Sequence, residues 1–190
     1  GPQLKQAVAA RRKVEPRPVG RKVRATARAP HRDASTGWWL VPLPTIDPLV
    51  VKRSAAALDR YGPDFEYAHY AAVKRLPVVV GGIAGVGALV AAAQVPPLRR
   101  FLLSRVPQGE GPSEEVRAKS WFTMRFVGEG GGRRVVTEVS GGDPGYGETA
   151  KMLAESALCL AFDDNPPTAG SVTTATAMAV NLVDRLTKAG

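Results

Sequence analysis

The 190-residue sequence has few of the residues that usually build metal and catalytic centres: one cysteine and two histidines. A single cysteine, Cys159, cannot form an intramolecular disulfide or a thiolate metal cluster, so we expect a reducing, cytoplasmic setting and no metal site. His31 and His69 do not combine with other side chains into a nucleophile, base and acid.

Acidic residues are scarce near the N-terminus, and the net charge of +9 is concentrated there. Residues 1–40 hold ten Lys and Arg against Glu15 and Asp33, a charge of +8, whereas the other 150 residues carry +1. Residues 14–37 mix Pro, Arg, Ala and Gly without helical or strand periodicity, which predicts an irregular basic segment over residues 1–37. This segment has no aromatic side chain to stack on bases, so we expect no nucleic-acid partner.

The remaining chain, residues 38–190, is long enough for one substantial core and predicts an α+β fold. Turn and periodicity signals predict helices over 48–61, 96–106, 147–162 and 173–188, and a β-hairpin over 120–140. Residues 64–73 fit a strand, with a helix as the alternative. Asp47 is expected to cap the first helix, and Ser113 a short turn before the hairpin. We expect a mixed, mostly antiparallel sheet, anchored by the hairpin and covered by the last two long helices.

The stretch from Lys74 to Arg100 has no charged residue between its two basic pairs, and three interpretations apply. Gly81, Gly85 and Gly87 suggest a dinucleotide-binding turn, but Pro96-Pro97 leaves the following helix too short for a βαβ unit. Residues 76–95 are long enough to span a membrane, although more than half are Ala, Gly, Pro or Gln, so the insertion energy is marginal. We favour a buried helix or one that lies on a membrane surface.

Individual polar residues are interpreted mainly as structural. Cys159 lies on an apolar helical face and is expected to be buried and inert, while Lys151 and Glu155 are spaced for a helical ion pair. His69 has two neighbouring tyrosines and can donate a proton near neutral pH, but a hydrogen-bonded structural role is the more common one. Asp163-Asp164 is typical of a helix end.

Four stretches together resemble the C-terminal part of saccharopine dehydrogenase-like oxidoreductases, in the actinobacterial branch of trans-acting enoyl reductases. The resemblance runs from Trp38 to the end and is most specific from Ser120 to Asp164. The stretches are PLPTIDPLVVKRSAAAL, YGPDFEYAHYAAVKRLP, SWFTMRFVGEGGGRRVVTEVSGGDPGYGETAKMLAESALCLAFDD and TAGSVTTATAMA.

The resemblance implies an enzyme that binds NADP or NAD in an N-terminal Rossmann domain and reduces an enoyl or keto group of a lipid or polyketide chain, in partnership with a polyketide synthase. The glycine fingerprint of that domain is absent here, so we expect a fragment or truncated protein: the substrate-side half of a reductase, which binds no cofactor and is inactive alone. A surface exposed where the Rossmann domain belongs would favour a homodimer.

Candidate site residues follow from the resemblance and the local pattern. We expect His69 or Tyr70 as proton donor, the aromatic residues Tyr67, Trp121 and Tyr146 as substrate-pocket walls, and the turn containing Gly141, Gly142 and Asp143 near the cofactor in the intact enzyme. A plain tight turn is an equal reading of the last group. The alternative function is a non-enzymatic membrane- or partner-binding module that uses helix 76–95 and the basic segment, with peripheral membrane association.

Overall fold

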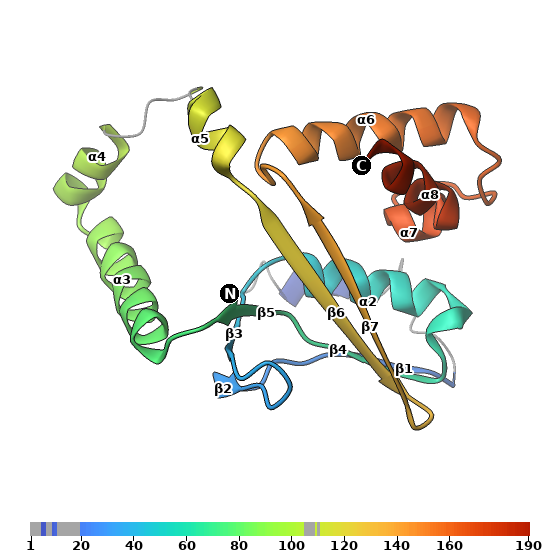
Figure 1. Ribbon diagram of the computed structural model, residues 1–190, viewed down its shortest axis with the longest axis horizontal. Helices are drawn as coiled ribbons and strands as arrows, with labels where there is room; N and C mark the ends of the chain where they lie inside the picture. The colour runs from blue at the N-terminus through green and yellow to red at the C-terminus, as the bar shows by residue number, and fades with distance from the viewer. Residues whose placement is uncertain (1–4, 7–8, 11–19, 105–108, 110) are drawn as a thin grey trace. The chain divides into compact units, whose positions relative to one another are not determined.

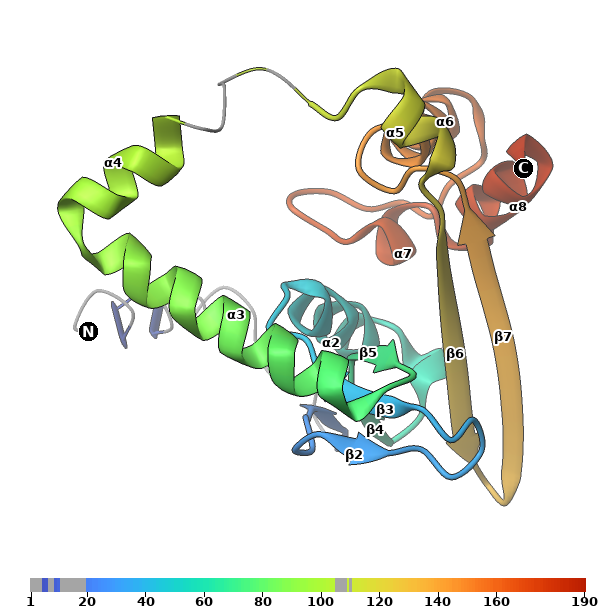
Figure 2. The same cartoon turned by 60° about the vertical axis from the view of Figure 1, so that its left-hand side comes forward.

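The computed structural model describes residues 5–6, 9–10, 20–104, 109 and 111–190. The chain divides into two compact units, Gly1–Phe101 and Leu102–Gly190. Figures 1 and 2 show the elements of each unit from two directions. The fold is mixed α+β, as expected.

Unit 1 contains two small sheets. In one, β1 (Lys22–Ala25) pairs in parallel with β4 (Asp64–Tyr67). In the other, β3 (Trp39–Pro42) lies between β2 (His31–Arg32) and β5 (Tyr70–Val73), and both pairings are antiparallel. The predicted strand over 64–73 is therefore two strands in different sheets, separated at Ala68 and His69.

Helix α2 (Asp47–Ala57) confirms most of the helix predicted over 48–61, and its last turn is the separate 3-10 helix η1 (Asp59–Tyr61). Gly62 ends this element with a φ of +76°. Capping by Asp47 is wrong, because Asp47 is already the first helical residue and the cap position, Ile46, offers no side-chain acceptor. Helix α2 packs on β1 and β4 and contains the buried Ser54 and Ala55.

The expectation of irregular structure over residues 1–37 is wrong for β1 and β2; residues 1–4, 7–8 and 11–19 lie outside the described part. Arg21, just before β1, links this segment to α2. Its guanidinium donates to the carbonyl oxygens of Ala55 and Leu58 at 2.8 Å each and pairs with Asp59 at 2.9 Å. The positive charge of this region is thus used partly within the fold, to close the C-terminal end of α2.

The long apolar stretch forms α3 (Leu76–Gln94), and the predicted amphipathic helix follows as α4 (Pro96–Ser104). The buried-helix interpretation is wrong for the described chain, because Val79 is the only buried residue in α3. No glycine of α3 approaches another part of the described structure, since an added Cβ would meet nothing within 4 Å.

Unit 2 begins with α5 (Glu114–Lys119), which Ser113 caps as expected: its Oγ accepts from the Val116 amide. The predicted hairpin is β6 (Phe122–Gly130) and β7 (Arg133–Gly141). It is followed by α6 (Gly147–Phe162), which has the predicted bounds. The predicted C-terminal helix is divided into α7 (Thr174–Ala177) and α8 (Ala179–Ala189), and α8 packs on α6.

The mostly antiparallel sheet expected from the sequence is wrong. The described residues form three separate small sheets, one of them parallel, and within this part of the chain β6 and β7 pair only with each other. Residues 123–140 are all exposed, so neither α6 nor α8 covers the hairpin as expected. The alternation along these strands predicted their type correctly, but it could not show which surface would cover them. A Rossmann-type origin stays a prediction.

The hairpin turn gives a testable expectation. Gly131 and Gly132 have φ of +56° and +73°, so both central positions are left-handed. Replacing Gly132 with Val should destabilise the hairpin by about 1–2 kcal/mol, because a β-branched side chain is strained there. Hydrogen exchange of the Gly128 and Val135 amides, which this turn places in a hydrogen-bonded pair, should accelerate roughly 5–30-fold. The matched change Gly130→Val, at a position of ordinary φ with open space, should leave exchange nearly unchanged, and equal effects would contradict the turn assignment.

Candidate functional site

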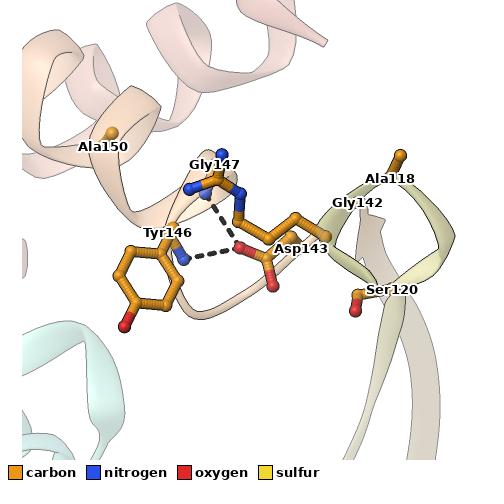
Figure 3. Close-up of a pocket in the computed structure, with 8 residues that line it drawn as sticks. Ala118, Ser120, Gly142, Asp143, Tyr146, Gly147 and Ala150 are labelled. Atoms are coloured by element: carbon orange, nitrogen blue, oxygen red, sulfur yellow. Dashed lines mark hydrogen bonds between the residues drawn. The ribbon is translucent and has the colours of Figure 1, made fainter. Parts of the chain in front are cut away.

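An open pocket of about 540 Å³ lies where β7 leads into α6. One wall comes from the end of α5 and the residues before β6, and the other from the turn after β7 and the first turns of α6 (Figure 3). The lining residues are Arg117, Ala118, Ser120, Gly142, Asp143, Tyr146, Gly147 and Ala150.

Asp143 organises the turn. Its Oδ2 accepts from the backbone amides of Tyr146 at 2.7 Å and Gly147 at 3.1 Å, as the dashed lines in Figure 3 show. These hydrogen bonds hold the pKa of Asp143 below its ordinary value, and the one from Gly147 has the largest effect. The charge of Arg117 makes a smaller contribution. The carboxylate therefore occupies the free amides at the start of α6.

Glu148 closes the same turn from the other side. Its Oε1 accepts from the Gly142 amide at 3.2 Å, and its Oε2 pairs with Lys151 at 2.7 Å. Lys151, followed by the Gly142 amide, lowers the pKa of Glu148. The predicted Lys151–Glu155 pair is wrong, because Glu155 pairs instead with Arg185.

These contacts test the turn as a cofactor site. A Cβ at Gly141 would come within 2.9 Å of the Phe122 ring and 3.1 Å of Glu148. Glycine is therefore needed at this position because side chains of the protein, not a cofactor, lie close to its backbone. The amides of Gly142 and Gly147 are already bound to carboxylates. A pyrophosphate here would face Asp143 and Glu148, so this turn does not fit that part of a nicotinamide cofactor.

Tyr146 gives the pocket its aromatic surface. The residue is 47% exposed, and the Arg117 guanidinium carbon lies 5.8 Å from the ring centroid. Gly111 packs against the ring, since a Cβ there would lie 2.7 Å from it. The Ser120 hydroxyl donates to the Val116 carbonyl at 2.8 Å. The pocket thus offers an aromatic face and a cation, which suits binding of a ligand rather than nucleophilic attack.

The remaining predicted site residues lie elsewhere. His69 and Tyr70 belong to unit 1, where His69 Nδ1 is 3.0 Å from the Tyr67 hydroxyl. The Tyr70 hydroxyl accepts from the Arg28 amide at 2.9 Å, and its ring meets that of His31 edge to face. His31, expected in an irregular tail, lies in β2. The structure therefore gives the candidate proton donors structural partners, and their catalytic role stays a prediction.

In unit 2 the pocket brings together Gly142, Asp143 and Tyr146 from the predicted set. Trp121 is 74% exposed and does not line it. Arg117 and Ser120 were missed, although a signal for them exists. Phe122 pairs with Gly141 across the hairpin, so the residues just before 122 and just after 141 must be neighbours.

Two further predictions concern metal binding and Cys159. The described residues contain no group of three or more His, Cys, Asp or Glu side chains that could hold a metal ion. Cys159 is fully buried, as expected, and burial raises the pKa of its thiol. Asp163 is the C-terminal cap residue of α6, which confirms the helix end.

The chain matches no family model, and no solved structure shows significant similarity to it. It is similar to proteins of Mycobacterium tuberculosis, strains H37Rv and CDC 1551, that are provisionally named trans-acting enoyl reductases. In both, 32% of residues are identical over an alignment of 154 residues. The alignment covers 74% of this chain and 37% of the relative. This similarity supports the enoyl reductase branch. The chain thus spans little more than a third of the relatives' length, and their whole activity enters below as a proposal.

Proposed function

We propose that this chain is the substrate-side part of an NAD(P)-dependent reductase of the saccharopine dehydrogenase-like kind, acting on the enoyl or keto group of a lipid or polyketide chain. The observation that carries the proposal is the 32% identity over 154 residues to named trans-acting enoyl reductases. A polyketide synthase is the proposed partner, because such an enzyme carries chains of this type. The proposed location is the cytoplasm.

The pocket geometry supports binding of the substrate here and binding of the cofactor in another domain. Reduction of a C=C bond needs a hydride and a proton, and a nicotinamide supplies the hydride. The amides of Gly142, Tyr146 and Gly147 are bound to the carboxylates of Glu148 and Asp143, so we place the cofactor phosphates in a separate nucleotide-binding domain. Tyr146 and Arg117 are left to hold the chain and a polar group beside its reactive end. His69 and Tyr70 remain the proposed proton donors.

A binding experiment tests the substrate assignment. The purified 190-residue chain should bind a fluorescent 2-enoyl thioester with a long acyl chain, bind NADPH weakly, and give no turnover. Tyr146→Ala should weaken thioester binding about tenfold, the scale of a lost aromatic contact. Trp121→Ala serves as control, because this exposed residue lies outside the pocket lining. Equal affinity of the Tyr146 variant and the native chain would remove the pocket from the proposal.

A chimera tests the reductase assignment separately. The matched region of the Mycobacterium tuberculosis relative is replaced by this chain, and NADPH oxidation is followed with the same thioester. We expect thioester-dependent oxidation. A chimera that folds and binds NADPH but oxidises none, beside an active native relative, would contradict the enzymatic reading and favour the alternative, a non-enzymatic membrane- or partner-binding module.

Exposed Val135, Val136 and Val139 on β7 support a proposed homodimer, which sedimentation tests.

A further inference from the structure

Helix α3 is apolar on its whole circumference and yet largely exposed. Its 19 residues include no charged side chain, and it is the one described helix long and apolar enough to cross a membrane. The aliphatic side chains beyond its first turn are between 54% and 63% exposed: Val80, Ile83, Val86, Leu89 and Val90. A helix that is apolar all round is normally buried in protein or lipid, so the large exposed side chains of α3 require a covering.

The side chains of α3 differ in size between its two sides. At 100° per residue, all Leu, Ile and Val of α3 fall within about 200° of the circumference. The opposite side holds only small residues and Pro77, and includes Gly81, Ala84, Ala88 and Ala91. Beyond Val79, which is buried, the bulky side can insert among acyl chains, whereas the small side adds little insertion energy and leaves backbone accessible to water.

Charge at both ends of the helix indicates which surface covers it. Lys74 and Arg75 precede α3, and Arg99 and Arg100 follow it in α4. The Lys74 ammonium lies 5.0 Å from the ring centroid of the partly exposed Trp38, an aromatic–cation pair typical of membrane interfaces.

Helix α4 also exposes large apolar side chains, but on one side only. Leu98, Phe101 and Leu102 share one side, following the i, i+3, i+4 pattern, and Arg99 and Arg100 lie off it. Phe101 is 51% exposed and Leu98 40% exposed. An amphipathic helix that directly follows α3 and carries two arginines suits the headgroup level of an anionic bilayer.

We propose that the α3–α4 segment, Lys74–Ser104, docks on an anionic lipid surface with α3 lying in the membrane plane, bulky side down, and its flanking basic pairs on lipid headgroups. An in-plane position is favoured over a span for two reasons. The small side contributes little insertion energy, and a span would place the two basic pairs on opposite faces of the bilayer. This docking does not depend on the reductase assignment.

Adjacent substitutions in α3 test both the docking and its orientation. The 190-residue chain is floated with phosphatidylcholine vesicles containing 30% phosphatidylglycerol. Ile83→Asp and Val86→Asp should abolish flotation, because they bury a charge among acyl chains. The matched controls Ala84→Asp and Ala88→Asp, on the small side of the same helix, should float like the native chain. Leu153→Asp, on the equally exposed surface of α6, checks that an added charge elsewhere has no effect.

Neutralising the basic pairs tests the lipid charge. Lys74→Gln with Arg75→Gln, and Arg99→Gln with Arg100→Gln, should each weaken binding to the anionic vesicles by about fivefold per residue and leave binding to pure phosphatidylcholine unchanged. Circular dichroism confirms that the variants remain helical.

Four results would overturn the proposal. If all four Asp variants of α3 fail to float, the helix spans the bilayer. If all float, the binding is due to another segment, such as the basic N-terminal residues, and high salt should then remove it. Absence of flotation for the native chain would mean that protein, not lipid, covers α3. Unchanged binding of the neutralised variants would exclude the anionic headgroups.

Discussion

Replacing Met178 with Ala lowers the free energy of unfolding of unit 2 by about 2–5 kcal/mol, the range for large-to-small changes in a core. Met178 is 2% exposed and lies between α7 and α8. Helix α8 packs on both α6 and α7, so a cavity there should loosen the contact between α8 and α6. Amides of α6 and α8 should lose hydrogen-exchange protection, while those of α2 in unit 1 keep theirs.

The control for this change is Val183→Ala in α8. Val183 is 60% exposed, so its truncation should alter the free energy of unfolding by less than about 0.5 kcal/mol when both variants are titrated with urea. Comparable midpoints for the two variants would show that Met178 is not a core residue in solution. Loss of protection across α2 as well would instead show that the two units unfold together.

The same pair shows where sequence periodicity succeeded and where it failed. The apolar spacing of the helix predicted over 173–188 places Met178, Leu182, Val183 and Leu186 on its inner face. Of the pair compared above, only Met178 is buried. Ala179 has a φ of +49°, which interrupts the helix and rotates the residues after it relative to those before. No local signal marks this break, because alanine otherwise favours helix strongly.

Elements defined by local chemistry were predictable. The hairpin followed from strand alternation on both sides of adjacent glycines, and α6 from its apolar spacing. In contrast, the parallel pairing of Val23 with Phe65 joins positions far apart in the sequence, and no nearby turn specifies it. The contacts of Arg21 were also unpredictable from the sequence. Nothing distinguishes this arginine from the other basic residues near it, although it donates to carbonyls at the end of α2.

The candidate site divides in the same way. Gly142, Asp143 and Tyr146 were predictable as a group because one turn contains them. Arg117 lies near these residues only because the hairpin pairs Phe122 with Gly141 and so brings the two ends of the hairpin together. The role given to Gly141 changed most: its lack of a side chain serves the approach of Phe122 and Glu148, a contact that only the folded structure reveals.

Replacing Arg185 with Met should release α8 from the end of α6 and markedly lower the thermal midpoint of unit 2. Its Nε and one terminal nitrogen donate to both oxygens of Asp163, at 2.6 and 2.8 Å, and the other terminal nitrogen lies 3.3 Å from Glu155. This fork needs guanidinium geometry, so Arg185→Lys should restore only part of the loss. Arg125→Met, which breaks an exposed hairpin pair with Glu138, is the matched control and should have little effect.

Acid titration adds a signature that a packing defect alone would not produce. Arg185, as hydrogen-bond donor, lowers the pKa of Asp163 below its ordinary value of 3.8. A carboxyl with a lowered folded-state pKa contributes stability above its unfolded-state pKa, and this contribution is lost as pH falls through the folded-state value. The native chain should therefore lose stability below about pH 4 more steeply than Arg185→Met, and the gap between them should narrow toward pH 2. Parallel pH profiles of the two proteins would show that Asp163 gains no stabilisation from Arg185.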